Sequence, residues 1–203
     1  VNRLIFSVAV MFINTLLGTF NATAVAVMGV IFRLQSFFLM AVFGLNQGYL
    51  PLVGYNFGYN KPDRLKRTVL LGWGTALTFG TIGFVVFQFF PEFMLSLFNN
   101  DPKLLKIGVP ALRRVSISYF FMVLNIIGVA TFQAIGQGLP SLMITILRQA
   151  VFLVPGMYII ANLAGLNASW FAFPIAEFLA FIIMATWLYR NLKLSMAEMK
   201  GLS

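Results

Sequence analysis

The sequence predicts an all-α membrane protein with six membrane-spanning helices. Hydrophobic residues make up 60% of the 203 positions, charged residues only 9%, and the mean hydropathy is +0.91. Apolar runs of about 20 residues or more recur along the chain, which is the length that a bilayer core about 30 Å thick requires. The connections between these runs are short and contain no low-complexity linker. These observations exclude a soluble domain and indicate one transmembrane domain over residues 1–203.

The first three predicted helices cover residues 4–20, 24–56 and 68–90. The second run is too long for one crossing, so we expect its helix to tilt or to extend beyond the hydrocarbon. Four basic residues and a single acid, Asp63, occupy the connection at 59–67. Because basic loops stay on the cytoplasmic side, this connection is predicted to be cytoplasmic.

The last three predicted helices cover residues 115–136, 140–163 and 168–189. The intervening loop at 91–114 would face outward, and its first part reads as a short interfacial helix. Arg190 and Lys193 follow the last helix. An even number of crossings then places both ends of the segment on the cytoplasmic side of the cell membrane.

Composition also excludes several function classes. The net charge of +9 comes from 14 basic and 5 acidic residues, and the basic residues gather at the ends of apolar runs, so topology explains them better than nucleic-acid binding. The chain has no Cys and no His, so disulfides, cofactor ligation and most metal sites lack their ligands. Neither a Ser-His arrangement nor a pair of carboxylates can be assembled within the helices, so we expect no enzyme, cofactor or metal.

One carboxylate, Glu177, lies inside the last apolar run. A helix that starts near Ala168 would place it roughly 14 Å deep, about the midplane of the bilayer. An ionisable side chain there is costly and usually functional, so Glu177 is our candidate for ion coupling or cation recognition. The alternative is a neutral acid that is hydrogen-bonded between helices.

Residues three, four and seven positions from Glu177 share its helix face. They are Trp170, Phe173, Pro174, Phe181 and Met184. Aromatic and Met side chains would suit lipophilic cations, although an ordinary lipid-facing surface would look the same. Pro174 also predicts a kink.

Four further polar residues interrupt the apolar runs. Asn14 and Asn125 are candidates to line a cavity or, more simply, to hydrogen-bond neighbouring helices. Arg33 and Arg148 are expected to extend toward an interface. A salt bridge from either arginine to Glu177 would argue against Glu177 as a free proton carrier.

Three stretches carry a family signature. They are Gly44-Leu-Asn-Gln-Gly-Tyr-Leu-Pro-Leu-Val-Gly-Tyr-Asn-Phe-Gly58, Phe132-Gln-Ala-Ile-Gly-Gln-Gly-Leu-Pro-Ser-Leu-Met-Ile-Thr-Ile-Leu-Arg-Gln149 and Trp170-Phe-Ala-Phe-Pro-Ile-Ala-Glu177. In this order they resemble the multidrug and toxic compound extrusion (MATE) family, and the resemblance runs along essentially the whole chain. The motif residues that could help the second helix bend or approach its neighbours are Gly44, Gln47, Gly48, Pro51, Gly54, Asn56 and Gly58.

The resemblance implies that the chain is the C-terminal six-helix lobe of a twelve-helix transporter, with the N-terminal lobe as its partner. Such a transporter would export lipophilic, often cationic, compounds in exchange for protons or sodium ions. The principal coupling acid of many bacterial members lies in the other lobe. Some members carry acids on the helices that match 4–20 and 115–136, where this chain has none, which argues against a sodium site of that type. A lipid-linked saccharide flippase and a non-transporting assembly subunit remain the alternatives.

Overall fold

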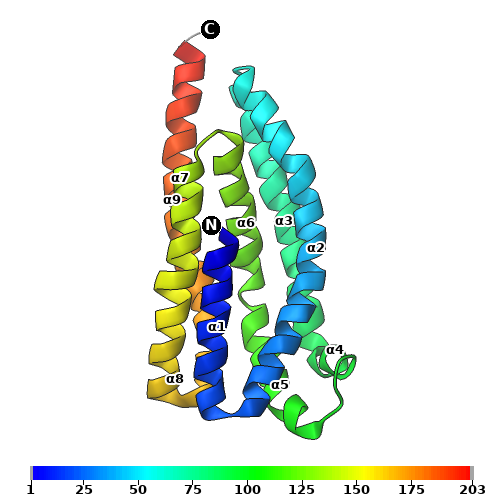
Figure 1. The fold of residues 1–203 in the computed structure, drawn as a ribbon. Coiled ribbons are helices and arrows are strands. Elements are labelled where there is room, and N and C mark those ends of the chain that lie inside the picture. The colour runs from blue at the N-terminus through cyan, green and yellow to red at the C-terminus, as the bar shows by residue number, and fades with distance from the viewer. Residues whose placement is uncertain (1, 202–203) are drawn as a thin grey trace.

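The computed structural model describes residues 2–201, and the side chains of 7–199 and 201. Over this range the regular structure is helical and contains no strand, which confirms the all-α prediction (Figure 1). The elements are α1 (Asn2–Phe20), α2 (Ala22–Gly58), α3 (Pro62–Phe89), α4 (Pro91–Ser96), α5 (Pro102–Ser116), α6 (Tyr119–Ala134), α7 (Gly138–Ile146), η1 (Leu147–Leu153), α8 (Val154–Ser169) and α9 (Ala172–Gly201).

Local sequence signals set the boundaries of the first helices. The side chain of Asn21 caps α2 by accepting a hydrogen bond from the Thr23 amide at 2.9 Å. Pro62 occupies the first turn of α3. Proline lacks an amide hydrogen, and an amide at this position would have no acceptor within the helix. The predicted ranges 4–20, 24–56 and 68–90 correspond to α1, α2 and α3.

The connection expected to be a loop at 91–114 is instead mostly helical. Pro91 starts α4, which lies in the region where a short helix was expected, but the prediction missed α5. Asp101 caps α5 through a 2.9 Å bond from the Lys103 amide, and Leu104, Ala111 and Leu112 bury one face of the helix. A bend of 49° separates α5 from α6.

The fifth predicted span is a composite of α7, η1 and α8. The middle part, η1, is a π-helix, a wide form that is rare and is frequently found at functional sites. Gly165, near the end of α8, has φ +79°, a conformation that favours glycine. The helical stretch therefore starts at Gly138, before the predicted residue 140, and a kink at Gly165 interrupts it close to the predicted end at residue 163.

The last helix begins later than predicted and runs further. The chain turns at residues 170 and 171, and α9 starts at Ala172, whereas the predicted span began at residue 168. Pro174 therefore lies in the first turn of α9, where its missing amide hydrogen breaks no helical bond. The kink predicted at Pro174 inside a helix is wrong for this reason.

The helices form one bundle with two connected apolar clusters. The first combines residues of α1, α2, α5, α8 and the start of α9, and includes Leu17, Ile31 and Trp170. The second combines α2, α3, α6 and α9, and includes Val53, Phe132 and Met184. Because α6 contacts α2, α3 and α9, it is the central helix of the bundle.

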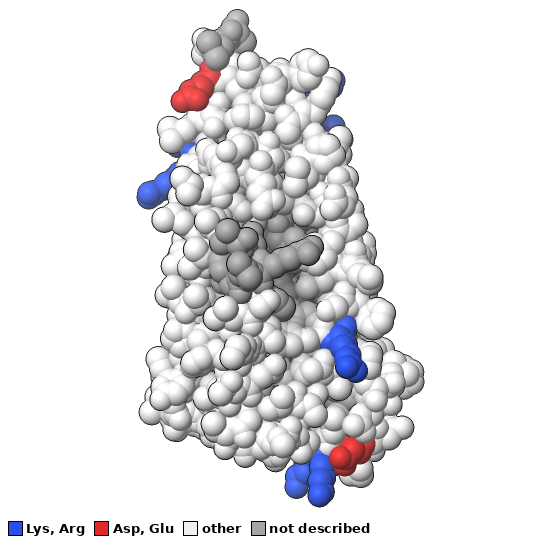
Figure 2. All heavy atoms as spheres, in the orientation of Figure 1, with Lys and Arg blue, Asp and Glu red and all other residues white. Residues whose placement is uncertain are grey.

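Length and composition identify the elements that can cross a membrane. Among the described residues, α2, α3, the stretch 138–169 and α9 each satisfy both conditions, and α5 with α6 satisfies them as one bent pair. The apolar part of α1, Ser7–Phe20, is shorter. Among the described residues, Figure 2 shows few charged side chains in the middle of one face, with basic and acidic residues mainly toward the two ends. This distribution matches a protein embedded in a bilayer.

Candidate functional site

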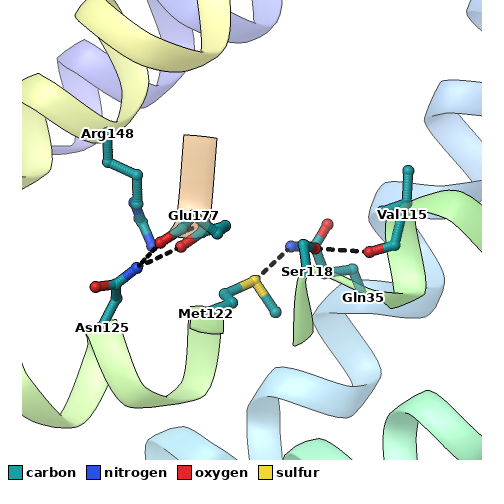
Figure 3. Close-up of polar contacts among 7 residues, drawn as sticks. All are labelled: Gln35, Val115, Ser118, Met122, Asn125, Arg148 and Glu177. Carbon is teal, nitrogen blue, oxygen red and sulfur yellow. Dashed lines mark hydrogen bonds and ion pairs between the residues drawn. The ribbon is translucent and has the colours of Figure 1, made fainter. Parts of the chain in front are cut away.

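Three helices bring three polar side chains together inside the bundle (Figure 3). Nη1 of Arg148, from η1, lies 3.3 Å from Oε1 of Glu177, from α9. Asn125, from α6, donates through Nδ2 to Oε2 of Glu177 at 2.8 Å and to the Glu177 backbone oxygen at 3.0 Å. We call Asn125, Arg148 and Glu177 the polar cluster.

Burial makes the contacts of the polar cluster important. The side chains of Arg148 and Glu177 are 22% and 12% exposed, and Asn125 is 1% exposed. An isolated charge in such surroundings is costly, and the opposite charge together with hydrogen bonds reduces that cost. Oδ1 of Asn125 is buried and has no hydrogen-bond partner among the described residues. The cluster therefore holds one acceptor that a donor or a cation could still use.

The sequence allowed a salt bridge to Glu177 from either Arg33 or Arg148, and Arg148 forms it. In this structure Glu177 is therefore paired, which argues against a free proton carrier. Its position along the helix also differs from the prediction. Because α9 starts at Ala172, Glu177 lies only about 8 Å along the helix axis from its first residue. The prediction, with a helix that enters the membrane near Ala168, gave roughly 14 Å.

The predicted aromatic wall beside Glu177 lies mainly inside the bundle. Trp170 and Met184 are fully buried, and Phe173 is buried, in the apolar clusters of this chain. Phe181 is half-buried, with its ring 6.1 Å from Trp73 and 5.8 Å from Phe121. A cavity-lining role for these residues stays a prediction.

Among the described residues, Asn14 forms no hydrogen bond or ion pair with the polar cluster. It lies on α1 and borders a shallow, open depression of about 490 Å³ with neighbours from the same helix: Ser7, Val10, Met11 and Thr15. Asn125, in contrast, joins α6 to α9 through its bonds to Glu177. The structure thus brings together Asn125 and Glu177 but not Asn14.

The glycine-rich motif lies entirely within α2, which continues through Pro51. Gly54 approaches α6, since a Cβ placed there would lie 3.5 Å from the Ala134 carbonyl oxygen. Asn56 donates to the Leu52 carbonyl at 2.9 Å and to Oγ1 of Thr68 at 3.0 Å, which joins α2 to α3. A Cβ on Gly44, Gly48 or Gly58 would meet nothing within 4 Å among the described residues. Only part of the motif therefore packs inside this chain.

Two polar contacts near the polar cluster were not predicted from the sequence. Nε2 of Gln35, on α2, contacts Sδ of Met122, on α6, at 3.0 Å, and Oε1 of Gln35 is buried without a partner among the described residues (Figure 3). Ser118 donates to the Val115 carbonyl at 2.6 Å at the bend between α5 and α6. The signal for Gln35 was present, because it is a polar residue in an apolar run.

Sequence comparisons agree with this architecture. The MatE family model matches residues 1–159. The multidrug export protein MepA of Staphylococcus haemolyticus is 27% identical over 176 residues, which cover 85% of this chain and 38% of that protein. A protein of Shewanella oneidensis called FAD transporter is 27% identical over 167 residues, which cover 82% of this chain and 37% of that protein. The chain thus spans well under half the length of these relatives.

Solved transporter structures share the fold. A multidrug resistance MATE family transporter in an outward-facing conformation superposes with a TM-score of 0.89 at 21% identity, covering 96% of this chain and 44% of that one. The bent form of a Vibrio cholerae MATE transporter gives 0.90, also at 21% identity and with the same coverage. The named relatives are transporters, which supports the expectation that the chain is not an enzyme. The chain therefore belongs to the MatE family and corresponds to one lobe of a MATE transporter.

Proposed function

We propose that this chain is the C-terminal lobe of a secondary multidrug exporter. The complete transporter would move lipophilic, often cationic, compounds out of the cell in exchange for protons or sodium ions. The N-terminal lobe would supply the opposite wall of the transport cavity, and both ends of this segment would lie on the cytoplasmic side of the cell membrane. The family match and the relatives named as multidrug export proteins support this proposal.

The polar cluster is the observation that carries the proposal. Oε1 of Glu177 lies 3.3 Å from Nη1 of Arg148 in a membrane-spanning bundle, so a proton or a cationic compound would compete with an internal cation for the same carboxylate. Protonation of Glu177 would remove the attraction for Arg148, and a bound cation would replace it. Either event would weaken the ion pair that joins η1 to α9. Ligand binding would thereby be coupled to the relative position of these two helices.

Ethidium efflux from cells tests this role directly. The full-length transporter is compared with Glu177→Gln at equal membrane expression, with proton and sodium gradients applied separately. The matched control is Glu92→Gln, which makes the same change on the exposed first turn of α4. We expect Glu177→Gln to abolish most gradient-driven efflux and Glu92→Gln to leave it unchanged.

Unchanged efflux in Glu177→Gln would refute the proposed role of this carboxylate. If the unaltered transporter moves no dye under either gradient, the cationic cargo itself is refuted. A non-transporting assembly subunit would then remain, and it would also tolerate Glu177→Gln in an assembly assay.

An anionic cargo is the second candidate, and two observations favour it. Arg148 is a cation within the polar cluster, and one relative is called FAD transporter. A flippase for lipid-linked saccharides would need such a basic site too. We rank this function second because Glu177 already neutralises Arg148. Transport of FAD or of an anionic lipid precursor, without any effect on ethidium, would reverse the order.

A further inference from the structure

A preformed apolar groove lies between α2, α3 and α4. Its volume is about 420 Å³, within the range of roughly 300–1,000 Å³ typical of small-molecule sites. The lining side chains are apolar and include Leu34, Phe37, Phe38, Ile82, Phe87 and Phe98. Leu34 and Phe87 are each 5% exposed and lie at the bottom, whereas Phe37 and Ile82 are 67% and 54% exposed and lie at the rim.

Aromatic contacts fix the bottom of this groove. The Phe38 ring stacks on Tyr119, with ring centres 5.0 Å apart and planes 7° apart, and Phe87 meets the same tyrosine edge-on at 5.4 Å. Gly83 allows Phe38 to lie against α3, since a Cβ there would fall 2.4 Å from the ring. The bottom of the groove is therefore shaped by packed side chains.

A cation without an ion pair among the described residues precedes the groove residues on α2. Arg33 is the single charged residue of α2, immediately before Leu34 and one helical turn before Phe37. Its side chain is exposed and forms no ion pair among the residues that the structure describes. A cation on an apolar span is costly unless it reaches a phosphate or water at the interface. Arginine binds phosphate oxygens particularly well through its forked donors.

We propose that the groove and Arg33 together bind an anionic phospholipid of the surrounding bilayer. One acyl chain would occupy the groove, and the headgroup phosphate would contact Arg33. An acyl chain fits because the lining is apolar, and an anionic headgroup fits because Arg33 is positive and forms no ion pair within the described part of the chain. This site lies apart from the polar cluster, and it requires the membrane-spanning fold but no particular cargo.

Photocrosslinking at the rim of the groove tests this site. The full-length transporter, with p-benzoylphenylalanine introduced at Phe37, is reconstituted in vesicles of phosphatidylglycerol and phosphatidylcholine in equal amounts. The measured quantity is the ratio of the two lipids crosslinked at that position. The control position is Leu70, which is 61% exposed on α3 and lies outside the groove. We expect phosphatidylglycerol to be favoured about fivefold at position 37 and not at position 70.

Two substitutions separate the headgroup contact from a general surface effect. Arg33→Gln should bring the ratio at position 37 close to one, and Arg33→Lys should retain most of it because the charge remains. A ratio near one in the unaltered transporter, or a ratio that Arg33→Gln leaves unchanged, would overturn the proposal. Crosslinks to the other lobe in place of lipid would also overturn it, because the groove would then be an interface within the transporter.

Discussion

Asn125, Arg148 and Glu177 show how single residues make charge tolerable inside a bundle. Glu177 accepts hydrogen bonds from an amide and lies beside a guanidinium, so both charges have a partner. Such a pair is not a simple source of stability, because removing two charges from water costs about as much as their attraction returns. Loss of only one partner of the pair, however, strongly lowers the free energy of unfolding, because the other charge is then buried without compensation.

The stability changes caused by substituting Arg148 and Glu177 singly and together should therefore be far from additive. Arg148→Met alone leaves Glu177 as an uncompensated acid and should destabilise the full-length transporter by about 3–5 kcal/mol. Arg148→Met combined with Glu177→Met should be much less harmful, because apolar side chains then replace the pair. Denaturation in detergent measures both. Equal or greater loss in the double variant would show that the pair is not coupled.

A buried hydroxyl pair predicts a smaller effect. Oη of Tyr49, on α2, lies 2.7 Å from Oγ1 of Thr131, on α6, and Thr131 also bonds the Ile127 carbonyl at 2.8 Å. Tyr49→Phe removes one bond while Thr131 keeps its backbone partner, so the expected loss is about 1 kcal/mol. Tyr55→Phe, at a site 51% exposed, is the control and should change stability little. Indistinguishable unfolding curves would contradict a stabilising role for the pair.

Sequence reasoning found the residues of the polar cluster but not their pairing. Glu177, Asn125 and Arg148 stand out because each interrupts an apolar run. Whether Arg33 or Arg148 meets Glu177 depends on how η1, α6 and α9 are rotated against each other, and no local pattern encodes that rotation. Gln35 itself interrupts an apolar run, but its contact could not be predicted because its partner is the thioether of Met122, which gives no polar signal in the sequence.

At the scale of elements, the apolar runs predicted where most helices lie because bilayer thickness sets their length. The apolar pattern failed at α5, because the basic residues on the exposed face of this helix interrupt it and predict a loop. The face at Leu104, Ala111 and Leu112 was the available signal. Arg114 also anchors this helix, donating to the Asn167 carbonyl and lying 5.2 Å over the Phe171 ring.

One of the close contacts between α2 and α3 depends on Gly72, as the contact of Phe38 depends on Gly83. A Cβ on Gly72 would lie 2.3 Å from the ring of Tyr49, whereas a Cβ on Gly74 meets nothing within 4 Å. Gly72→Ala should therefore lower stability by about 1–3 kcal/mol through overpacking. Gly74→Ala, on the same helix, should be neutral or slightly stabilising. Thermal unfolding of the two variants compares them directly, and equal midpoints would refute this account of the contact.

For the whole molecule, charge distribution makes orientation testable. The chain has no Cys, so one cysteine can report one position once the rest of the transporter is also free of cysteine. Lys66→Cys, near the start of α3, should react with an impermeant maleimide only after the cells are opened. Lys103→Cys, in α5, should react in intact cells. The reverse pattern would invert the proposed topology.

The electrical neutrality of the polar cluster has a consequence for energetics. An ion pair of Arg148 and Glu177 has no net charge, so the membrane potential does no net work when the pair moves as a unit. After protonation of Glu177 the same movement would carry one elementary charge, worth about 2.3 kcal/mol for each 100 mV of the field that it crosses. The pairing state of one side chain would thus decide whether voltage, in addition to the concentration gradient, drives this lobe.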